Sequence, residues 1–225
     1  MIAEKVNYSK DVLLDPNCPH WVKFKGEKMK LSATPLANQP SEYIKATRDE
    51  KKVGKVKEVM VRAAHNGKEV FFHMEWLDAE KNLEITANDV FPDGASILFP
   101  IKPVTGKETE PPIDEMGKKD LPVNAWQWRS DLKEAQNTWA EGLGTTSWSE
   151  KCSITARSQW KDGVWKLVFA RPLTVKENNP KKPESVQLAV GKTVKTGISI
   201  WEGSNGERAG LKAFSKEWKD LTLAK

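Results

Sequence analysis

Residues 56–78 read VKEVMVRAAHNGKEVFFHMEWLD, and they form the clearest hairpin pattern in the chain. The first half is rich in β-branched residues, which favour strands. In the second half apolar residues alternate, so that one face of the predicted strand carries Val70, Phe72, Met74 and Trp76. Asn66 and Gly67 stand between the two halves, and Asn-Gly is the strongest short signal for a tight hairpin turn. The stretch therefore predicts two antiparallel strands with one face turned towards a core.

Similar patterns recur after this hairpin. Residues 95–101 predict a buried strand, residues 152–160 and 163–171 a second hairpin, and residues 186–190 and 195–201 the last strands. A short helix is possible at residues 131–139. Strands at hairpin spacing with little helix indicate an all-β fold, an antiparallel β-sandwich with long irregular loops. We expect residues 1–29 to be an extended N-terminal arm anchored by Trp21, and residues 30–225 to form a single sandwich domain.

The composition is that of a soluble globular chain. Of the 225 residues, 38% are hydrophobic and 30% charged, and no apolar run approaches the roughly 18 residues that a membrane-spanning helix needs. The net charge is +5, but lysines and acidic residues are interleaved, as in residues 55–58, and no basic stripe is present. We therefore expect neither nucleic-acid binding nor a membrane span.

The cysteines and the N-terminus leave two questions open. Cys18 and Cys152 permit one disulfide in an oxidising compartment, or two unrelated thiols. Residues 1–8 lack the apolar core of a signal peptide. The numbering is then that of a mature exported protein, or the chain stays in the cytoplasm.

A loop near the C-terminus has an unusual glycine content. Residues 195–218 read KTGISIWEGSNGERAGLKAFSKEW, a strand followed by Gly203, Gly206 and Gly210. Glycines at this spacing suit a backbone that turns repeatedly and lets a bulky group approach closely. Lys212 follows directly; its side chain is either solvated or points into the space that the loop surrounds.

A second long loop ends in a tryptophan-rich strand. Residues 111–128 read PPIDEMGKKDLPVNAWQW, so Met116 and Gly117 lie in a proline-rich loop before the strand. A loop of this length in a compact domain commonly has a function.

Together these two stretches resemble the ethylbenzene dehydrogenase-type haem-binding family. Its members are the gamma subunits of molybdenum enzymes such as ethylbenzene and dimethylsulfide dehydrogenases, selenate and chlorate reductases and related nitrite oxidoreductases. The matching positions are Met116, Gly117, Pro122, Val123, Asn124, Trp126, Trp128, Glu202, Gly203, Asn205, Gly206, Glu207, Arg208, Gly210, Lys212, Ser215 and Trp218. The chain departs from the family at residues 113–115, where relatives are more apolar.

The resemblance implies a non-covalent haem b with Met116 and Lys212 as axial ligands of the iron. The chain has no C-x-x-C-H motif, which excludes covalent c-type attachment. An amine binds iron only when it is deprotonated, and burial lowers the pKa of a lysine. Without the resemblance, the methionine reads as a packing residue and the lysine as a solvated one. Met60, Met74 and Lys216 are the reserve ligands.

Four further predictions accompany the haem. Trp126, Trp128 and Trp201 are expected to form pocket walls, although single tryptophans are more often core residues. Arg208 is expected to form a salt bridge either with a haem propionate or with a nearby glutamate, Glu202 or Glu207.

The resemblance implies a haem b electron-transfer subunit with no catalysis of its own. Its partners would be an iron–sulfur beta subunit and a molybdopterin alpha subunit, which carry those cofactors, and an external carrier such as cytochrome c. The resemblance also implies a periplasmic location for this chain. The alternative is a non-catalytic carbohydrate-binding β-sandwich module, because exposed tryptophans on a sandwich can stack on sugar rings. An isolated enzyme has little support, since no nucleophile–base pair stands out.

Overall fold

The chain is built almost entirely of β-strands. The structure is a computed structural model that describes residues 1–39, 41–149, 152–177, 179 and 181–225. The strands are β1 (Ile2–Lys5), β2 (Glu27–Lys30), β3 (Ser32–Ala33), β4 (Glu58–His65), β5 (Glu69–Leu77), β6 (Gly94–Pro100), β7 (Val123–Arg129), β8 (Gln136–Ala140), β9 (Ser147–Trp148), β10 (Thr155–Lys161), β11 (Val164–Pro172), β12 (Thr193–Trp201), β13 (Ala213–Phe214) and β14 (Lys219–Leu223).

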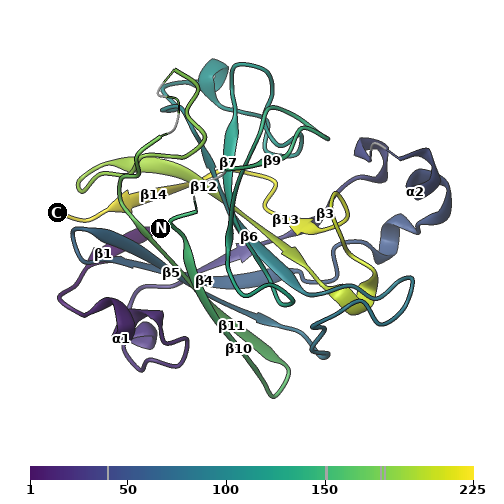
Figure 1. Ribbon diagram of the computed structural model, residues 1–225, viewed down its shortest axis with the longest axis horizontal. Helices are drawn as coiled ribbons and strands as arrows, with labels where there is room; N and C mark the ends of the chain where they lie inside the picture. Colours follow the sequence, from purple (N-terminus) through teal and green to yellow (C-terminus); the bar gives the residue numbers. More distant parts are fainter. Residues whose placement is uncertain (40, 150–151, 178, 180) are drawn as a thin grey trace.

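The helices are short and lie at opposite edges of the molecule (Figure 1). They are α1 (Lys10–Leu14) and α2 (Glu42–Thr47), with the 3-10 turns η1 (Trp21–Lys23), η2 (Leu36–Asn38), η3 (Glu50–Lys52), η4 (Lys107–Thr109) and η5 (Gly203–Asn205). Ser9 and Ser41 cap the two α-helices through their side chains. The predicted all-β class with little helix is confirmed.

Both predicted hairpins are present. Strands β4 and β5 pair across Asn66 and Gly67, and β10 and β11 pair across Asp162 and Gly163. The possible helix at residues 131–139 was wrong, because residues 136–140 form β8, which pairs along β7. Residues 186–190 form no named strand either, although Leu188 donates its amide to the carbonyl of Leu173. Pairing with β7, rather than local propensity, decided the structure of residues 136–140.

The strands form two layers that share one continuous ladder. Its order is β10-β11-β5-β4-β1-β14-β12-β6-β7-β8-β9. Most pairs are antiparallel, as predicted for the sandwich, but β1 is parallel to both β14 and β4, so the sheet is mixed. Strand β12 crosses between the layers: residues 193–196 pair with β14 and residues 197–201 with β6.

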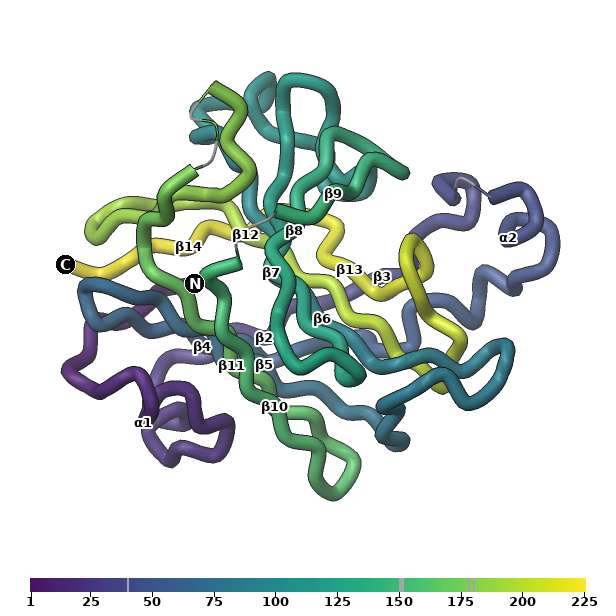
Figure 2. The backbone as a smooth tube through the Cα atoms, viewed as in Figure 1, coloured from purple at the N-terminus to yellow at the C-terminus, as the bar shows by residue number. Residues whose placement is uncertain are grey.

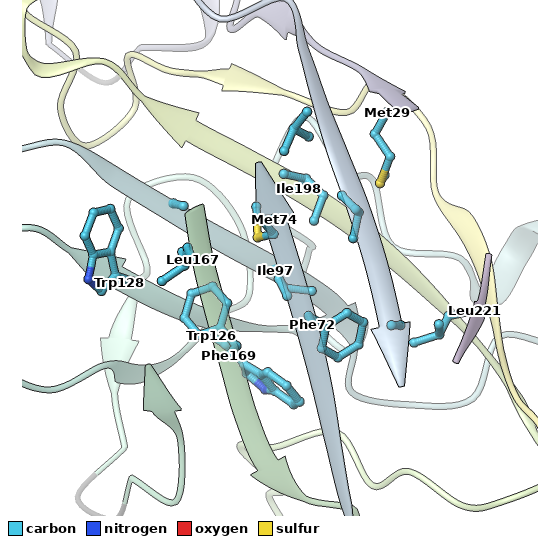
Figure 3. Close-up of a cluster of buried hydrophobic side chains, with 14 of the residues drawn as sticks. Met29, Phe72, Met74, Ile97, Trp126, Trp128, Leu167, Phe169, Ile198 and Leu221 are labelled. Atoms are coloured by element: carbon cyan, nitrogen blue, oxygen red, sulfur yellow. The ribbon is translucent and has the colours of Figure 1, made fainter. Parts of the chain in front are cut away.

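The main core lies between the two layers. Phe72 and Met74 of β5 face Ile97 of β6, Trp126 of β7 and Ile198 of β12 (Figure 3). The alternating face predicted for the second hairpin strand is therefore the core face. Burial of such side chains contributes about 1.5–3 kcal/mol each relative to exposure.

Residues 1–29 contribute two strands to the sheet and cover its outer side. Strand β1 lies between β14 and β4, and β2 pairs with β4. Trp21 is buried in a second cluster with Phe71, and its ring stacks on His73 at 5.0 Å. Burial lowers the pKa of His73 to about 4. The division between an arm and a domain at residue 30 stays a prediction.

Among the described residues, no helix combines the length and the apolar character that crossing a bilayer would require. The two cysteines are not bridged; Cys18 is buried and Cys152 exposed.

The layered core yields a direct stability test. Phe72 is fully buried, so Phe72→Ala should lower the free energy of unfolding by about 3–5 kcal/mol through lost burial and the remaining cavity. Leu77→Ala, at an exposed site on the same strand, should stay within about 0.5 kcal/mol of the parent. Urea unfolding followed by tryptophan fluorescence measures both. If both variants lowered the free energy of unfolding by the same amount, the face of β5 that carries Phe72 would not be the core face.

Candidate functional site

A large cavity lies over the outer face of the layer that contains β6, β7 and β8. Its volume is about 570 Å³, within the range of small-molecule and cofactor sites. Alternation along β7 turns Ala125, Gln127 and Arg129 towards the cavity, while the residues between them face the core. The rest of the wall comes from irregular segments around residues 34–39, 85–92, 114–116, 143–148 and 207–212.

Met116 enters this cavity from the long proline-rich loop. Its backbone has φ 59°, a left-handed conformation that is uncommon outside glycine, and Gly117 follows with φ 85°. A Cβ at Gly117 would lie 2.8 Å from the carbonyl oxygen of Leu121. The turn is held by hydrogen bonds from the Met116 amide to Ile113 and from the Gly117 amide to Pro112. A strained backbone persists only where the surrounding structure holds it in place, and such residues are concentrated at functional sites.

Lys212 reaches the same point from the C-terminal loop. Its carbonyl accepts hydrogen bonds from the amide and the hydroxyl of Thr34, at 3.0 Å each, just before β13 begins. The residue is 7% exposed, and its Nζ lies 3.2 Å from Sδ of Met116 and 5.1 Å from the ring centroid of Trp201. Burial lowers the pKa of Lys212 to about 8. The amine is therefore close to losing its proton at neutral pH.

An amine and a thioether in contact form a donor pair suited to a transition metal. The thioether is a soft, neutral ligand, and a buried amine with a depressed pKa has a lone pair available. Among the described residues, no cluster of His, Cys, Asp and Glu offers a competing metal site. Lys212 and Met116 would be the two side chains that hold a metal ion at this point, with the amine nitrogen and the thioether sulfur as its ligands.

The glycine-rich loop is fixed by two buried carboxylates. Glu207 accepts hydrogen bonds from the amides of Lys55 and Glu202, at 2.9 and 3.1 Å, and from the side chain of Asn205. Asp93 accepts a hydrogen bond from the amide of Gly203 at 2.9 Å. Burial raises the pKa of Glu207 and raises that of Asp93 to about 6. These contacts hold residues 203–212 beside residues 34–55, as the tubes in Figure 2 show.

Of the other predicted site residues, the cavity includes Trp201 and Arg208. Trp201 lines the wall and donates its indole hydrogen to the carbonyl of Ala209 at 2.9 Å. Arg208 is exposed at the cavity, with its guanidinium 4.2 Å from the ring centroid of Phe91. Neither Glu202 nor Glu207 forms a salt bridge with Arg208 in the described part of the chain; Glu207 instead accepts hydrogen bonds from other donors.

The structure does not bring Trp126 and Trp128 to the cavity. Both point between the layers, where Trp126 packs on Phe99 and Trp128 on Trp165. The reserve ligands also lie elsewhere: Met60 is on β4 outside the cavity lining, Met74 is in the central core, and Lys216 is exposed.

Several lining residues escaped the sequence analysis. On strands they are Ser96, Gln127, Arg129 and Thr138, and in loops they include Thr34, Gln39 and Phe91. The polar residues Gln127 and Arg129 beside two tryptophans were the one available signal, because such alternation marks two different faces. At the cavity mouth, Ile85, Leu143 and Trp148 expose large apolar side chains. Nothing in their local sequence relates them to one another.

Comparison with known proteins identifies relatives along most of the chain. The model of the family described as "Ethylbenzene dehydrogenase" matches residues 19–151 and 143–213. The chlorate reductase gamma subunit of Ideonella dechloratans is 34% identical over 152 residues, which cover 68% of this chain and 59% of the relative.

Two other relatives are more distant. A Haloferax mediterranei protein named "Putative respiratory nitrate reductase heme subunit ORF7" is 28% identical, over 82% of this chain and 60% of the relative. The dimethylsulfide dehydrogenase gamma subunit of Rhodovulum sulfidophilum is 24% identical, over 72% of this chain and 58% of the relative. The matched part of this chain therefore spans less than two thirds of each relative's length.

Two solved structures share the fold of this chain. A "putative carbohydrate-binding protein" from Bacteroides uniformis superposes with a TM-score of 0.54 at 10% identity, over 99% of this chain and 98% of that one. A family 9 carbohydrate binding module from Caldicellulosiruptor kristjanssonii, in complex with glucose, gives 0.51 at 8% identity, over 99% and 94%. At such identities the likeness shows the fold alone.

The buried amine predicts a pH-dependent stability of the cofactor-free chain. Below pH 8 the folded and unfolded states both carry the Lys212 proton, and the folded state bears the cost of burying the charge. Between about pH 8 and 10.5 the unfolded state binds more protons than the folded state, so stability rises with pH. Lys212→Met should therefore be more stable than the parent by about 3 kcal/mol at pH 7.

This advantage should disappear as the pH rises past 10.5, where the ordinary lysine pKa lies. Urea unfolding of both proteins across this range measures it. Lys216→Met, at an exposed lysine, provides the control and should stay within about 0.5 kcal/mol of the parent. A pH-independent difference for the Lys212 variant would contradict burial of a charged amine.

Proposed function

Because the chain belongs to the ethylbenzene dehydrogenase family, we propose that it is a haem b electron-transfer subunit, the gamma subunit of a molybdenum oxidoreductase complex. One of the relatives is named a heme subunit, and two others are gamma subunits of a chlorate reductase and a dimethylsulfide dehydrogenase. The cofactor would be held without covalent bonds in the cavity of about 570 Å³.

The observation that carries this proposal is the contact between Lys212 and Met116. The amine is buried, and its one hydrogen-bond partner among the described residues is the thioether sulfur at 3.2 Å. A buried ammonium without a carboxylate is costly, so its position needs a compensating role. Axial ligation of iron supplies one, since the neutral amine is the form that burial favours. We assign Lys212 and Met116 as the axial ligands.

The remaining lining residues suit a flat, anionic cofactor. Trp201 and Phe91 offer apolar walls, and Gly94 and Gly210 lie at the cavity without side chains that would block close approach. Arg208 has its guanidinium at the cavity, so it can pair with a propionate. We leave Trp126 and Trp128 out of the proposed pocket.

The chain's own task is to set the environment of the cofactor. When bound, haem supplies one-electron redox chemistry. Met116 and Lys212 are both neutral donors, so this ligand set adds no negative charge to stabilise the ferric state; thioether ligation raises the reduction potential. The loops bury the amine of Lys212, and Met116 beside it is half-buried. The exposed side chains of Ile85, Leu143 and Trp148 leave one side of the cavity open.

Partners and location follow from the same proposal. An iron–sulfur beta subunit and a molybdopterin alpha subunit would supply or accept electrons on one side, and a carrier such as cytochrome c on the other. The complex would lie in the periplasm. These statements concern the whole assembly, and the matched part of the chain spans about 60% of the length of its relatives.

The alternative, a carbohydrate-binding module, receives less support from the side chains. All ten tryptophans lie in the described part of the chain, and Trp148 is the one that is exposed. Sugar-binding by stacking needs aromatic faces open to solvent, and one exposed tryptophan beside a deep cavity provides little platform. The likeness of fold therefore does not extend to a visible sugar-binding surface.

Absorption spectroscopy tests the haem proposal. The full chain produced with haem should show a low-spin, six-coordinate spectrum with sharp ferrous α and β bands and a b-type pyridine haemochromogen. Met116→Ala and Lys212→Ala should each change the spin state and weaken haem binding by about 100-fold, because each removes an axial bond. Haem titration followed at the Soret band measures the affinity.

Matched controls are available for both ligands. Met60→Ala and Lys216→Ala change the same residue types away from the cavity lining and should leave the spectrum unchanged. A normal low-spin spectrum in both ligand variants would refute the ligand assignment. A colourless chain that fails to take up haem and is retarded on polysaccharide gels would replace the proposal with the carbohydrate-binding alternative.

A further inference from the structure

The floor of the large cavity changes from apolar to polar along β7. On the cavity side of this strand the side chains are, in chain order, Val123, Ala125, Gln127 and Arg129. Val123 and Ala125 belong to an apolar cluster against which Met116 packs. Gln127 and Arg129 lie at the other end of the strand and line the cavity. One end of the floor therefore suits hydrocarbon, and the other end suits a group that accepts hydrogen bonds.

The neighbouring strand β6 continues the polar end of the floor. Ser96 of β6 lies directly opposite Gln127 in the ladder, so the two side chains share one face of the sheet. Ser96 is 2% exposed, and Gln127 is half-buried. Both side chains line the cavity, and neither makes a hydrogen bond in the described part of the chain. Buried polar groups ordinarily have partners, so a bound group is needed to satisfy these two.

Two arginines lie at the same end of the cavity. Arg129 lies opposite Gly94 in the ladder, and Gly94 is three residues after Phe91. The guanidinium of Arg208 lies over the ring of Phe91, at 4.2 Å from its centroid. Both arginines line the cavity together with Phe91 and Gly94. The polar end thus combines an amide, a hydroxyl and two guanidinium groups.

Arg129 has hydrogen-bond donors available although it forms an ion pair. Its Nε and Nη2 donate to the carboxylate of Asp131, at 3.1 and 2.8 Å. A guanidinium has five N–H groups, so Nη1 and the second hydrogen of Nη2 remain available. The side chain of Arg129 is 40% exposed, which leaves these donors within reach of a ligand. Because Asp131 offsets the charge of Arg129, the donors rather than a net positive charge select the ligand.

The two carboxylates of the cavity lining do not use these donors. Asp114 is exposed and lies two residues before Met116, whose side chain packs at the apolar end. The carboxylate of Glu207 already accepts three hydrogen bonds from other segments. In the described part of the chain neither carboxylate forms a salt bridge with Arg129 or Arg208. A carboxylate of a ligand can therefore occupy this end.

Haem has the same division, because its ring is apolar and its two propionates lie at one edge. Resting on the proposed function, we propose that Arg129 and Gln127 bind one propionate, so that the acidic edge of the cofactor faces the polar end of the floor. Arg208 remains available to the second propionate. Arg129 is then a cofactor-binding residue in addition to the two axial ligands.

Titration with haem and with haem dimethyl ester, followed at the Soret band, tests this orientation. The ester has the same ring and iron but no ionised propionates. The parent should bind haem at least about 10-fold more tightly than the ester, because charge-assisted hydrogen bonds are lost with the ester. Arg129→Met should bind haem about 10-fold more weakly than the parent and the ester equally well. Arg157→Met removes an exposed arginine outside the cavity and should bind both compounds as the parent does.

Two further variants separate propionate binding from a structural role of the ion pair. Asp131→Asn breaks the same pair but leaves the guanidinium in place, so haem should bind at least as tightly as to the parent. Gln127→Leu leaves the pair intact and should weaken haem binding about 3-fold without affecting the ester, which decides the question if Arg129→Met does not fold.

The outcomes distinguish this orientation from the haem proposal itself. Equal affinity of the parent for haem and ester, or equal weakening of both by Arg129→Met, would overturn the assignment of Arg129 while haem binding stands. Weakening of haem binding by Asp131→Asn to the same extent as by Arg129→Met would also overturn it, because the ion pair alone would then explain the effect. A parent that develops no Soret band with either compound would overturn the haem proposal as well.

Discussion

The burial of one amine is the constraint on which the site depends. Lys212 has its Nζ in contact with a thioether and a tryptophan ring, and no acidic side chain compensates for its charge among the described residues. An ammonium in such surroundings is unfavourable, so the loops must be held by contacts elsewhere. Those contacts come from the backbone of Lys212 on Thr34, and from Glu207 and Asp93 on the glycine-rich loop. The rest of the fold is the support for this arrangement.

The layered fold separates stability from function. On β7, the tryptophans face inwards and fill the space between the layers, while the residues that alternate with them form the floor of the cavity. Strand β12 contributes Ile198 and Ile200 to the core and Trp201 to the cavity. A single strand can therefore anchor the sandwich and position the site, because its successive side chains point to opposite faces.

The same scaffold occurs in carbohydrate-binding proteins with very different sequences. In this chain the two donors of the candidate site lie in loops. The left-handed turn at Met116 and the loop from Glu202 to Lys212 have no part in the ladder of the sheet. When a binding site is formed by loops at one face of a sandwich, the loops can change while the core keeps its shape. The fold therefore does not identify the ligand.

The sequence by itself predicted the all-β class and the hairpins at Asn66 and Asp162, which follow from alternation and turn residues. Met116 and Lys212 as a donor pair were implied by the resemblance to the family, and the strand at residues 136–140 was missed. Only the tertiary structure decided that Met116 and Lys212, 96 residues apart, meet at 3.2 Å. It also decided which side of β7 faces the main core. Both faces of that strand are covered by other segments, and alternation along the strand does not indicate which segments cover which face. The parallel position of β1 likewise depends on contacts between segments distant in the chain, which no local pattern encodes.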